Sequence, residues 1–259
     1  MAQIIRVRQH LRRGFPVRSH SRKIKIPPAW KNVKHFTNRP YVATGVDSKG
    51  RLQYVYPKHV LEQGANRKYK RIERLAGRKE EILGEIIQDA KDGRVEAQAV
   101  YTMYKTGFRP GSEKDTKSDV RAYGATTLLR RQVKVKPKNK VEFDFIGKKG
   151  VRVKKEVQDR LLSKIMKERR KDEHVFDTSD AEVREYWNNR TRGQFQLKDL
   201  RTLKAFETAD KILKSTAAKS PIEIKKEVIQ AVSKELGNTP AIAASSYIAP
   251  KIAELKKKN

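Results

Sequence analysis

The stretch Leu236-Gly237-Asn238-Thr239-Pro240-Ala241-Ile242-Ala243-Ala244-Ser245-Ser246-Tyr247-Ile248-Ala249-Pro250 combines a helix stop, a helix restart and one tyrosine. A helix over 220–236 is predicted by its start and stop signals: Ser220, Pro221, Glu223 and Gly237. Thr239 and Pro240 then start a short helix, which brings Tyr247 about two turns in. Most buried tyrosines pack their ring in the core and keep only the hydroxyl polar. This stretch alone therefore does not indicate a functional role for Tyr247, and the evidence has to come from the rest of the chain.

The composition indicates a folded chain with a polyanionic partner. Its 259 residues, 37% of them hydrophobic, suffice for a real core, and 61 Lys+Arg against 30 Asp+Glu give a formal charge of +31. Such a charge favours nucleic acid as the partner. An anionic membrane is a less favoured partner, since no apolar run approaches the ~20 residues that span a bilayer.

Several kinds of chemistry find no support in the residues. The chain has no cysteine, which excludes disulfides and thiolate catalysis, and its five histidines show no metal-ligand spacing. No phosphate-binding loop is present, so we expect neither a metal nor a nucleotide cofactor. The segment Met1–Arg6 lacks the apolar core of a signal peptide, and we expect an intracellular or virion-internal protein.

The first 68 residues predict a basic lobe that faces DNA. They hold 16 Lys/Arg against Asp47 and Glu62. Residues 41–46 and 52–56 flank a turn-forming cluster at 47–51 and predict a β-hairpin. Its second strand brings together side chains that can contact bases or phosphates, although aromatic packing on an edge strand explains the tyrosines as well. The DNA-contact candidates are Lys49, Arg51, Gln53, Tyr54 and Tyr56.

The remainder predicts helices around a small sheet. Helical spacing runs from 69 to about 92, and a second helix ends at Gly107, just before Arg109. Residues 122–129 look packed and helical. Period-2 alternation then predicts three strands with Lys148 at the second hairpin tip. Further helices are expected at about 157–171, after Ser179, and at 197–214.

Several motifs resemble the type IB DNA topoisomerase family, most closely its small poxvirus-type and bacterial-type members, over nearly the whole chain. The N-terminal motifs are Ile26-Pro27-Pro28-Ala29-Trp30, Asp47-Ser48-Lys49-Gly50-Arg51 and Gln53-Tyr54-Val55-Tyr56. The others are Gly107-Phe108-Arg109, Tyr123-Gly124-Ala125-Thr126-Thr127-Leu128, Phe143-Asp144-Phe145-Ile146-Gly147-Lys148, Lys198-Asp199-Leu200-Arg201-Thr202 and the stretch around Tyr247. Any one motif is weak, but their joint order and approximate spacing are specific. The resemblance implies an α+β fold: a small β-rich lobe (1–70) and a mostly α-helical catalytic domain (71–259) with a three-stranded antiparallel sheet.

The resemblance implies that Tyr247 attacks one strand of duplex DNA, giving a 3′-phosphotyrosyl enzyme and a free 5′-hydroxyl. A tyrosine hydroxyl is a weak nucleophile at neutral pH and benefits from fixed cations. Arg109 and Arg201 would supply these and stabilise the five-coordinate phosphorus. Lys148 would protonate the leaving 5′ oxygen. Religation is then plain reversal, without ATP or metal, and strand rotation relaxes supercoils of either sign.

Asn238 departs from the pattern of many family members, which carry a phosphate-contacting histidine nine residues before the tyrosine. The resemblance suggests that bacterial-type members have asparagine there too. An amide can donate to a phosphate oxygen but carries no charge. A helix-terminus role is the alternative for Asn238.

Two other functions are compatible with parts of the sequence. A tyrosine recombinase would share the two arginines, the lysine and the tyrosine, but it usually has a histidine where this chain has Lys198. A non-enzymatic basic nucleic-acid-binding protein is what composition alone favours. We expect a monomer, because no heptad pattern is visible.

Overall fold

The computed structural model describes residues 3–7, 10–12, 15–17, 20–116, 121–168, 174–217 and 220–249. The chain divides into two compact units: the first ends at Arg67 and the second begins at Lys68. This boundary lies inside the helix α1 (Lys58–Gly77). The functional division at residue 70 that the sequence suggests stays a prediction.

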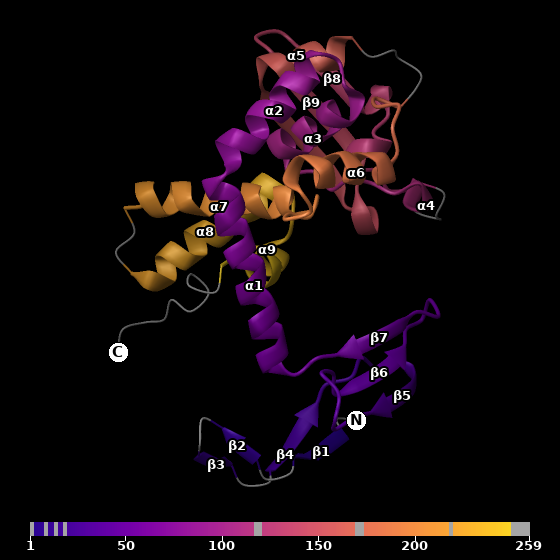
Figure 1. The fold of residues 1–259 in the computed structure, drawn as a ribbon, viewed down its shortest axis with the longest axis vertical. Coiled ribbons are helices and arrows are strands. Elements are labelled where there is room, and N and C mark those ends of the chain that lie inside the picture. Colours follow the sequence, from indigo (N-terminus) through magenta and orange to yellow (C-terminus); the bar gives the residue numbers. More distant parts are fainter. Residues whose placement is uncertain are drawn as a thin grey trace. The chain divides into compact units, whose positions relative to one another are not determined.

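The N-terminal unit is built from short antiparallel strands (Figure 1). Two hairpin-like pairs join β1 (Gln3–Val7) to β4 (His20–Ile24) and β2 (His10–Arg12) to β3 (Phe15–Val17). A three-stranded sheet follows, in the order β5 (Lys31–His35), β6 (Ala43–Val46) and β7 (Leu52–Val55). The predicted hairpin is confirmed: β6 pairs with β7 from Ala43 opposite Val55 to Val46 opposite Leu52.

The second unit is mostly helical around one antiparallel sheet, so the α+β prediction is confirmed. The sheet order is β10 (Arg152–Gln158), β9 (Lys140–Ile146) and β8 (Val133–Lys136). The helices after α1 are α2 (Lys79–Lys91), α3 (Val95–Thr106), α4 (Glu113–Thr116), α5 (Arg160–Lys167), α6 (Asp180–Thr191), α7 (Asp199–Ser215), α8 (Pro221–Leu236) and α9 (Pro240–Ser246).

Three predictions about helices are wrong. The single helix expected from 69 to 92 is two helices, because α1 ends at Gly77 and α2 begins at Lys79. The stretch 122–129 is packed but not an α-helix, since only a 3₁₀ turn at Ala125–Thr127 forms. The helix expected from 157 begins at Arg160, because β10 continues to Gln158 and the Asp159 carboxylate caps the helix by accepting from the Leu162 amide at 2.8 Å.

The start and stop signals before Tyr247 are confirmed. The Ser220 hydroxyl and the Glu223 carboxylate form a capping box at the start of α8. Gly237 ends that helix with φ +62°, a conformation that glycine adopts without strain. The Thr239 hydroxyl accepts from the Ile242 amide and opens α9, and Tyr247 stands at its C-cap.

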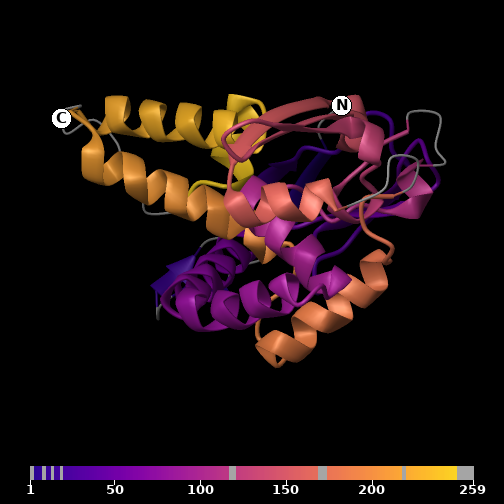
Figure 2. The ribbon, with the colours of Figure 1, turned by 90° about the horizontal axis from the view of Figure 1, so that it is seen from above.

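Among the described residues, most of the buried apolar side chains form two clusters. The larger one holds Trp187, Phe143, Phe176 and Met103, with residues from α1 to α3, the sheet, α5 and α6. In the smaller one Ala205 and Ala209 of α7 pack with Val228 and Val232 of α8, and small residues four apart let the two helices approach closely. Figure 2 shows α7 and α8 side by side with α9 at one end. Tyr247 belongs to this smaller cluster.

Candidate active site

Tyr247 lies close to a buried cation. Its side chain is 8% exposed and packs with Leu236, Ala243 and Ile248. The Nε of Arg201 donates to the Tyr247 hydroxyl oxygen at 3.1 Å. The simple packing interpretation of Tyr247 therefore describes only the ring, because its hydroxyl oxygen faces a guanidinium.

Arg201 holds several segments together from the first turn of α7. It is 7% exposed. Its Nη1 donates to the Gly107 carbonyl, and its Nη2 donates to the Leu236 carbonyl at 2.8 Å and to Asn238 Oδ1 at 2.9 Å. Burial lowers the pKa of Arg201, Tyr247 raises it and Arg109 adds to the lowering. A guanidinium has five N–H groups, so these contacts and Tyr247 engage all but one of them.

Asn238 follows the end of α8 and is held on both sides. Its amide N–H donates to the Ser233 carbonyl at 3.0 Å, and its own carbonyl accepts from the Ser233 hydroxyl at 2.6 Å. Because its Oδ1 accepts from Arg201, the Nδ2 group points elsewhere. That Nδ2 is buried and has no hydrogen-bond partner within the described parts of the chain. An unused buried donor is costly, so an oxygen brought beside it would be a favourable acceptor.

One cavity of about 610 Å³ brings most of the predicted residues together. Its lining includes Arg109, Lys148, Arg201 and Asn238. Arg109 follows the end of α3 and is exposed, and Lys148 is exposed at the tip between β9 and β10. The described lining includes Ser246 but not Tyr247. The nucleophile candidate therefore lies just behind the cavity wall.

Gly107 allows the end of α3 to lie close to the end of α8. It ends α3 with φ +69°, which is the left-handed region. A Cβ at this position would lie 3.0 Å from Leu236 Cδ2. Glycine therefore allows the close contact between the ends of α3 and α8, and its carbonyl accepts from Arg201.

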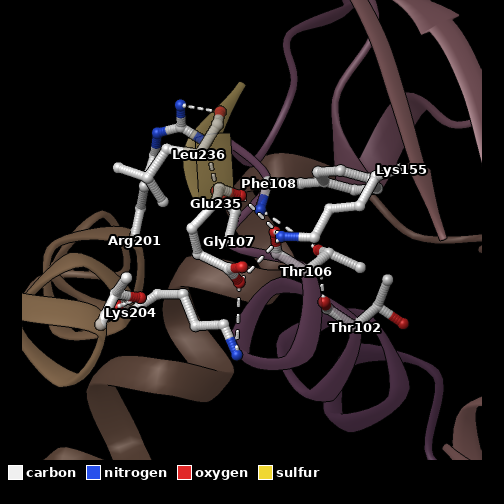
Figure 3. A network of polar contacts seen from close by, with 10 residues as sticks. Thr102, Thr106, Gly107, Phe108, Lys155, Arg201, Lys204, Glu235 and Leu236 are labelled. Carbon is white, nitrogen blue, oxygen red and sulfur yellow. Dashed lines mark hydrogen bonds and ion pairs between the residues drawn. The ribbon is translucent and has the colours of Figure 1, made fainter. Parts of the chain in front are cut away.

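Two lysines that the sequence reasoning missed lie beside these residues. The Lys68 ammonium donates to the Ser246 carbonyl at 2.7 Å and stands 5.4 Å from the Tyr247 ring centroid. The Lys155 ammonium donates to the Thr106 carbonyl at 2.8 Å and to the Glu235 carbonyl at 2.7 Å (Figure 3). Burial lowers the pKa of both lysines. The periodicity of the sequence shows which residues face inward, but not that a lysine among them binds carbonyls.

The first turn of α7 is tied to α1 by a buried ion pair. Arg71 Nε donates to Asp199 Oδ2 at 2.6 Å and its Nη2 to Oδ1 at 2.9 Å. Asp199 is fully buried and also accepts from the Gln196 amide at 2.9 Å. Since Arg201 is two residues further along α7, this pair helps to fix where its guanidinium emerges.

The DNA-contact candidates all lie in the N-terminal unit, on or next to the β6–β7 hairpin. Asp47 accepts from the Lys49 and Arg51 amides, from the Arg51 guanidinium at 2.6 Å and from Gln53 Nε2 at 3.0 Å. The hydrogen bond from the Arg51 side chain is the main reason that the pKa of Asp47 is lowered to about 2. The polar groups of Arg51 and Gln53 thus already stabilise the turn.

The tyrosines of this hairpin pack against each other and remain partly exposed. Tyr41 meets Tyr54 with ring centroids 5.0 Å apart and Tyr56 at 6.4 Å. Tyr54 and Tyr56 are 43% and 41% exposed. The cross-strand aromatic packing that the sequence left open is therefore present, and both Tyr54 and Tyr56 keep part of their surface exposed.

Neither a metal site nor a membrane span is found among the residues that the structure describes. No three His, Asp or Glu side chains there gather as a metal site. None of the helices described is both long and apolar enough to cross a bilayer.

Comparison with known proteins gives two consistent findings. A profile of the family described as Eukaryotic DNA topoisomerase I, catalytic core, matches residues 58–258. The chain is also similar to DNA topoisomerase 1B of Acanthamoeba polyphaga mimivirus, with 26% identity over 267 residues that cover 92% of this chain and 79% of the viral protein. The profile match begins at the first residue of α1 and includes all five predicted catalytic residues.

Proposed function

The chain belongs to the DNA topoisomerase I family and is a type IB DNA topoisomerase, and we propose that it cleaves DNA through a 3′-phosphotyrosyl intermediate on Tyr247. The hydroxyl oxygen of Tyr247 forms a bond to phosphorus while the bond from phosphorus to the 5′ oxygen breaks. The tyrosine proton leaves to water, and Lys148 protonates the departing 5′ oxygen. Religation reverses these steps, so neither ATP nor metal is consumed.

The contacts around Arg201 are the main support for this proposal. One guanidinium holds the hydroxyl oxygen of Tyr247 and Oδ1 of Asn238, and it lines the same cavity as Arg109 and Lys148. A cation fixed 3.1 Å from the attacking oxygen favours the negative charge that develops there.

The two arginines have different tasks in this proposal. Arg201 already donates most of its N–H groups to protein oxygens. It can therefore offer the phosphate its positive charge and one remaining N–H donor. Arg109 is exposed on the cavity, where its two-pronged end can bind two non-bridging oxygens. Asn238 Nδ2 donates to a non-bridging oxygen and thereby satisfies its unused hydrogen bond.

Between cleavage and religation, the free 5′ end rotates about the intact strand and relaxes positive or negative supercoils. The protein acts as a monomer on duplex DNA, inside a cell or a virion. Residues 1–70, including Lys49, Arg51, Gln53, Tyr54 and Tyr56, bind the duplex, and residues 71–259 perform the chemistry. Because the chain has a formal charge of +31, its affinity for DNA falls steeply with added salt.

The test uses the Tyr247→Phe variant on supercoiled plasmid without magnesium or ATP. The parent protein relaxes the plasmid and, after denaturation, stays bound to the 3′ end of a nicked strand, whereas the variant does neither. Relaxation or a covalent adduct in the variant would exclude Tyr247 as the nucleophile. A plasmid without paired target sites also separates this activity from that of a recombinase.

A further inference from the structure

Two cations, Lys155 and Arg201, bind main-chain oxygens at the C-terminal ends of α3 and α8 (Figure 3). The last carbonyls of a helix lack partners within it and carry partial negative charge. At the end of α3 the Thr106 carbonyl accepts from Lys155 and the Gly107 carbonyl from Arg201. At the end of α8 the Glu235 carbonyl accepts from Lys155 and the Leu236 carbonyl from Arg201. Each cation therefore joins the two helix ends.

Lys155 is fixed firmly in this arrangement. Its side chain is 16% exposed, and its ammonium also donates to Glu235 Oε1 at 3.0 Å. Lys204 stands 3.6 Å from the same carboxylate. Three acceptors use all three protons of the Lys155 ammonium, so this lysine has no donor left for DNA.

The two helix ends lead directly to residues that line the cavity. Arg109 comes two residues after Gly107, and Asn238 comes two residues after Leu236. The exit of α3 is fixed further by Thr106, whose hydroxyl donates to the Thr102 carbonyl at 2.6 Å and accepts from the Phe108 amide at 3.2 Å. The distance between the two helix ends therefore sets the distance between Arg109 and Asn238.

We propose that Lys155 is a positioning residue for strand cleavage: it holds the ends of α3 and α8 together so that Arg109 and Asn238 meet the same phosphate. The proposal rests on the proposed function, since it concerns the step in which Tyr247 attacks. Lys155 touches neither DNA nor the reacting atoms and acts through main-chain oxygens. A displacement of about 1 Å at a reacting group can cost about 100-fold in rate, which is the effect expected when Lys155 is lost.

The experiment compares Lys155→Met with Lys154→Met, its exposed neighbour on β10. Single-turnover cleavage of a short duplex and noncovalent DNA affinity are measured well below the melting temperature, and a thermal melting curve is recorded for each variant. We expect Lys155→Met to cleave about 100-fold more slowly with unchanged DNA affinity. Lys154→Met should cleave at the parent rate.

A second variant separates positioning from stability. Lys155→Met leaves the Glu235 carboxylate with fewer partners, and the added Glu235→Gln change removes that charge. The double variant should melt at a higher temperature than Lys155→Met but cleave just as slowly, because the two main-chain carbonyls still lack their donor. Recovery of the cleavage rate together with the melting temperature would show that Lys155 is only structural and would overturn the proposal.

The leaving group provides a third readout. A 5′-bridging sulfur in place of oxygen leaves without a proton, so it relieves a defect in Lys148 but not one in Arg109 or Asn238. Lys155→Met should stay slow on the sulfur substrate, and full rescue would contradict the assignment. Tyr247→Phe is run alongside: if it still forms the adduct, the proposed function fails, whereas normal cleavage by Lys155→Met alone refutes only the role of Lys155.

Discussion

Changing Asn238 to aspartate tests the site with almost no change in shape. The Oδ1 atom that accepts from Arg201 Nη2 at 2.9 Å is kept. The buried Nδ2 donor is replaced by a second oxygen that carries negative charge. If Nδ2 serves the phosphate, Asn238→Asp removes one hydrogen bond and adds repulsion at the same point.

The expected magnitude follows from those two changes. A hydrogen bond to a charged group contributes about 1.5–3 kcal/mol. Two unit charges about 4 Å apart repel by roughly 4 kcal/mol at an effective dielectric of about 20, and about half of that applies to an oxygen that shares its charge with others. The sum, about 3.5–5 kcal/mol, corresponds to a cleavage rate roughly three orders of magnitude lower.

The folded state should tolerate the same substitution. The contact with Arg201 becomes a charged pair, so we expect the free energy of unfolding to change by about 1 kcal/mol or less, which is a melting shift of about 2–4 °C. The assay measures single-turnover formation of the covalent adduct, with thermal melting of the same preparations.

Asn238→Ala is the matched control, because it loses the donor without adding a charge. It should cleave faster than Asn238→Asp, although it also loses the acceptor for Arg201. If the two variants cleave equally fast, or if Asn238→Asp cleaves like the parent, Asn238 does not face the phosphate and the reasoning is refuted.

Three further predictions concern the general acid, the buried ion pair and the N-terminal hairpin. Lys148→Met should be slow on an ordinary duplex and near the parent rate on one with a 5′-bridging sulfur, because a thiolate leaves unprotonated; slow cleavage of both would exclude Lys148 as the general acid. Arg71→Met leaves the fully buried Asp199 carboxylate without its partner and should cost about 3–5 kcal/mol of unfolding free energy in a denaturant titration; an unchanged midpoint would contradict this. The pKa of Asp47 is lowered from 3.8 to about 2, chiefly by the side-chain hydrogen bond from Arg51, so the stabilisation is present above about pH 4 and is lost as the pH falls toward 2; an NMR titration of this carboxyl should have its midpoint near 2 rather than 3.8.

Local sequence signals predicted the helices around Tyr247 well because their ends carry explicit caps. Ser220 and Gly237 mark the two ends of α8, and Thr239 marks the start of α9. Such signals act within a few residues and need no tertiary context. The break between α1 and α2 was missed although Gly77 stands at it, because Leu75 and Ile82 keep a helical spacing across it.

The catalytic candidates were found from motifs, but their mutual arrangement was not. The sequence named Arg201 as a donor to phosphate, whereas the structure shows that its N–H groups mostly hold the protein itself. Lys68 and Lys155 escaped notice because their acceptors include main-chain oxygens, which look the same in every residue. The short strands β1 to β4 were not individually predicted, because the basic segment 1–25 shows little alternation of apolar residues.

The anchoring of Lys155 and Arg201 on the ends of α3 and α8 has a consequence for mutational mapping. Four of their acceptors are main-chain oxygens, those of Thr106, Gly107, Glu235 and Leu236. Alanine scanning leaves every one of these oxygens in place, so it does not report how much cleavage depends on the hydrogen bonds that they accept. An amide-to-ester replacement at Gly237 weakens the preceding Leu236 carbonyl as an acceptor. Backbone substitutions of this kind test main-chain hydrogen bonds that no side-chain mutation removes.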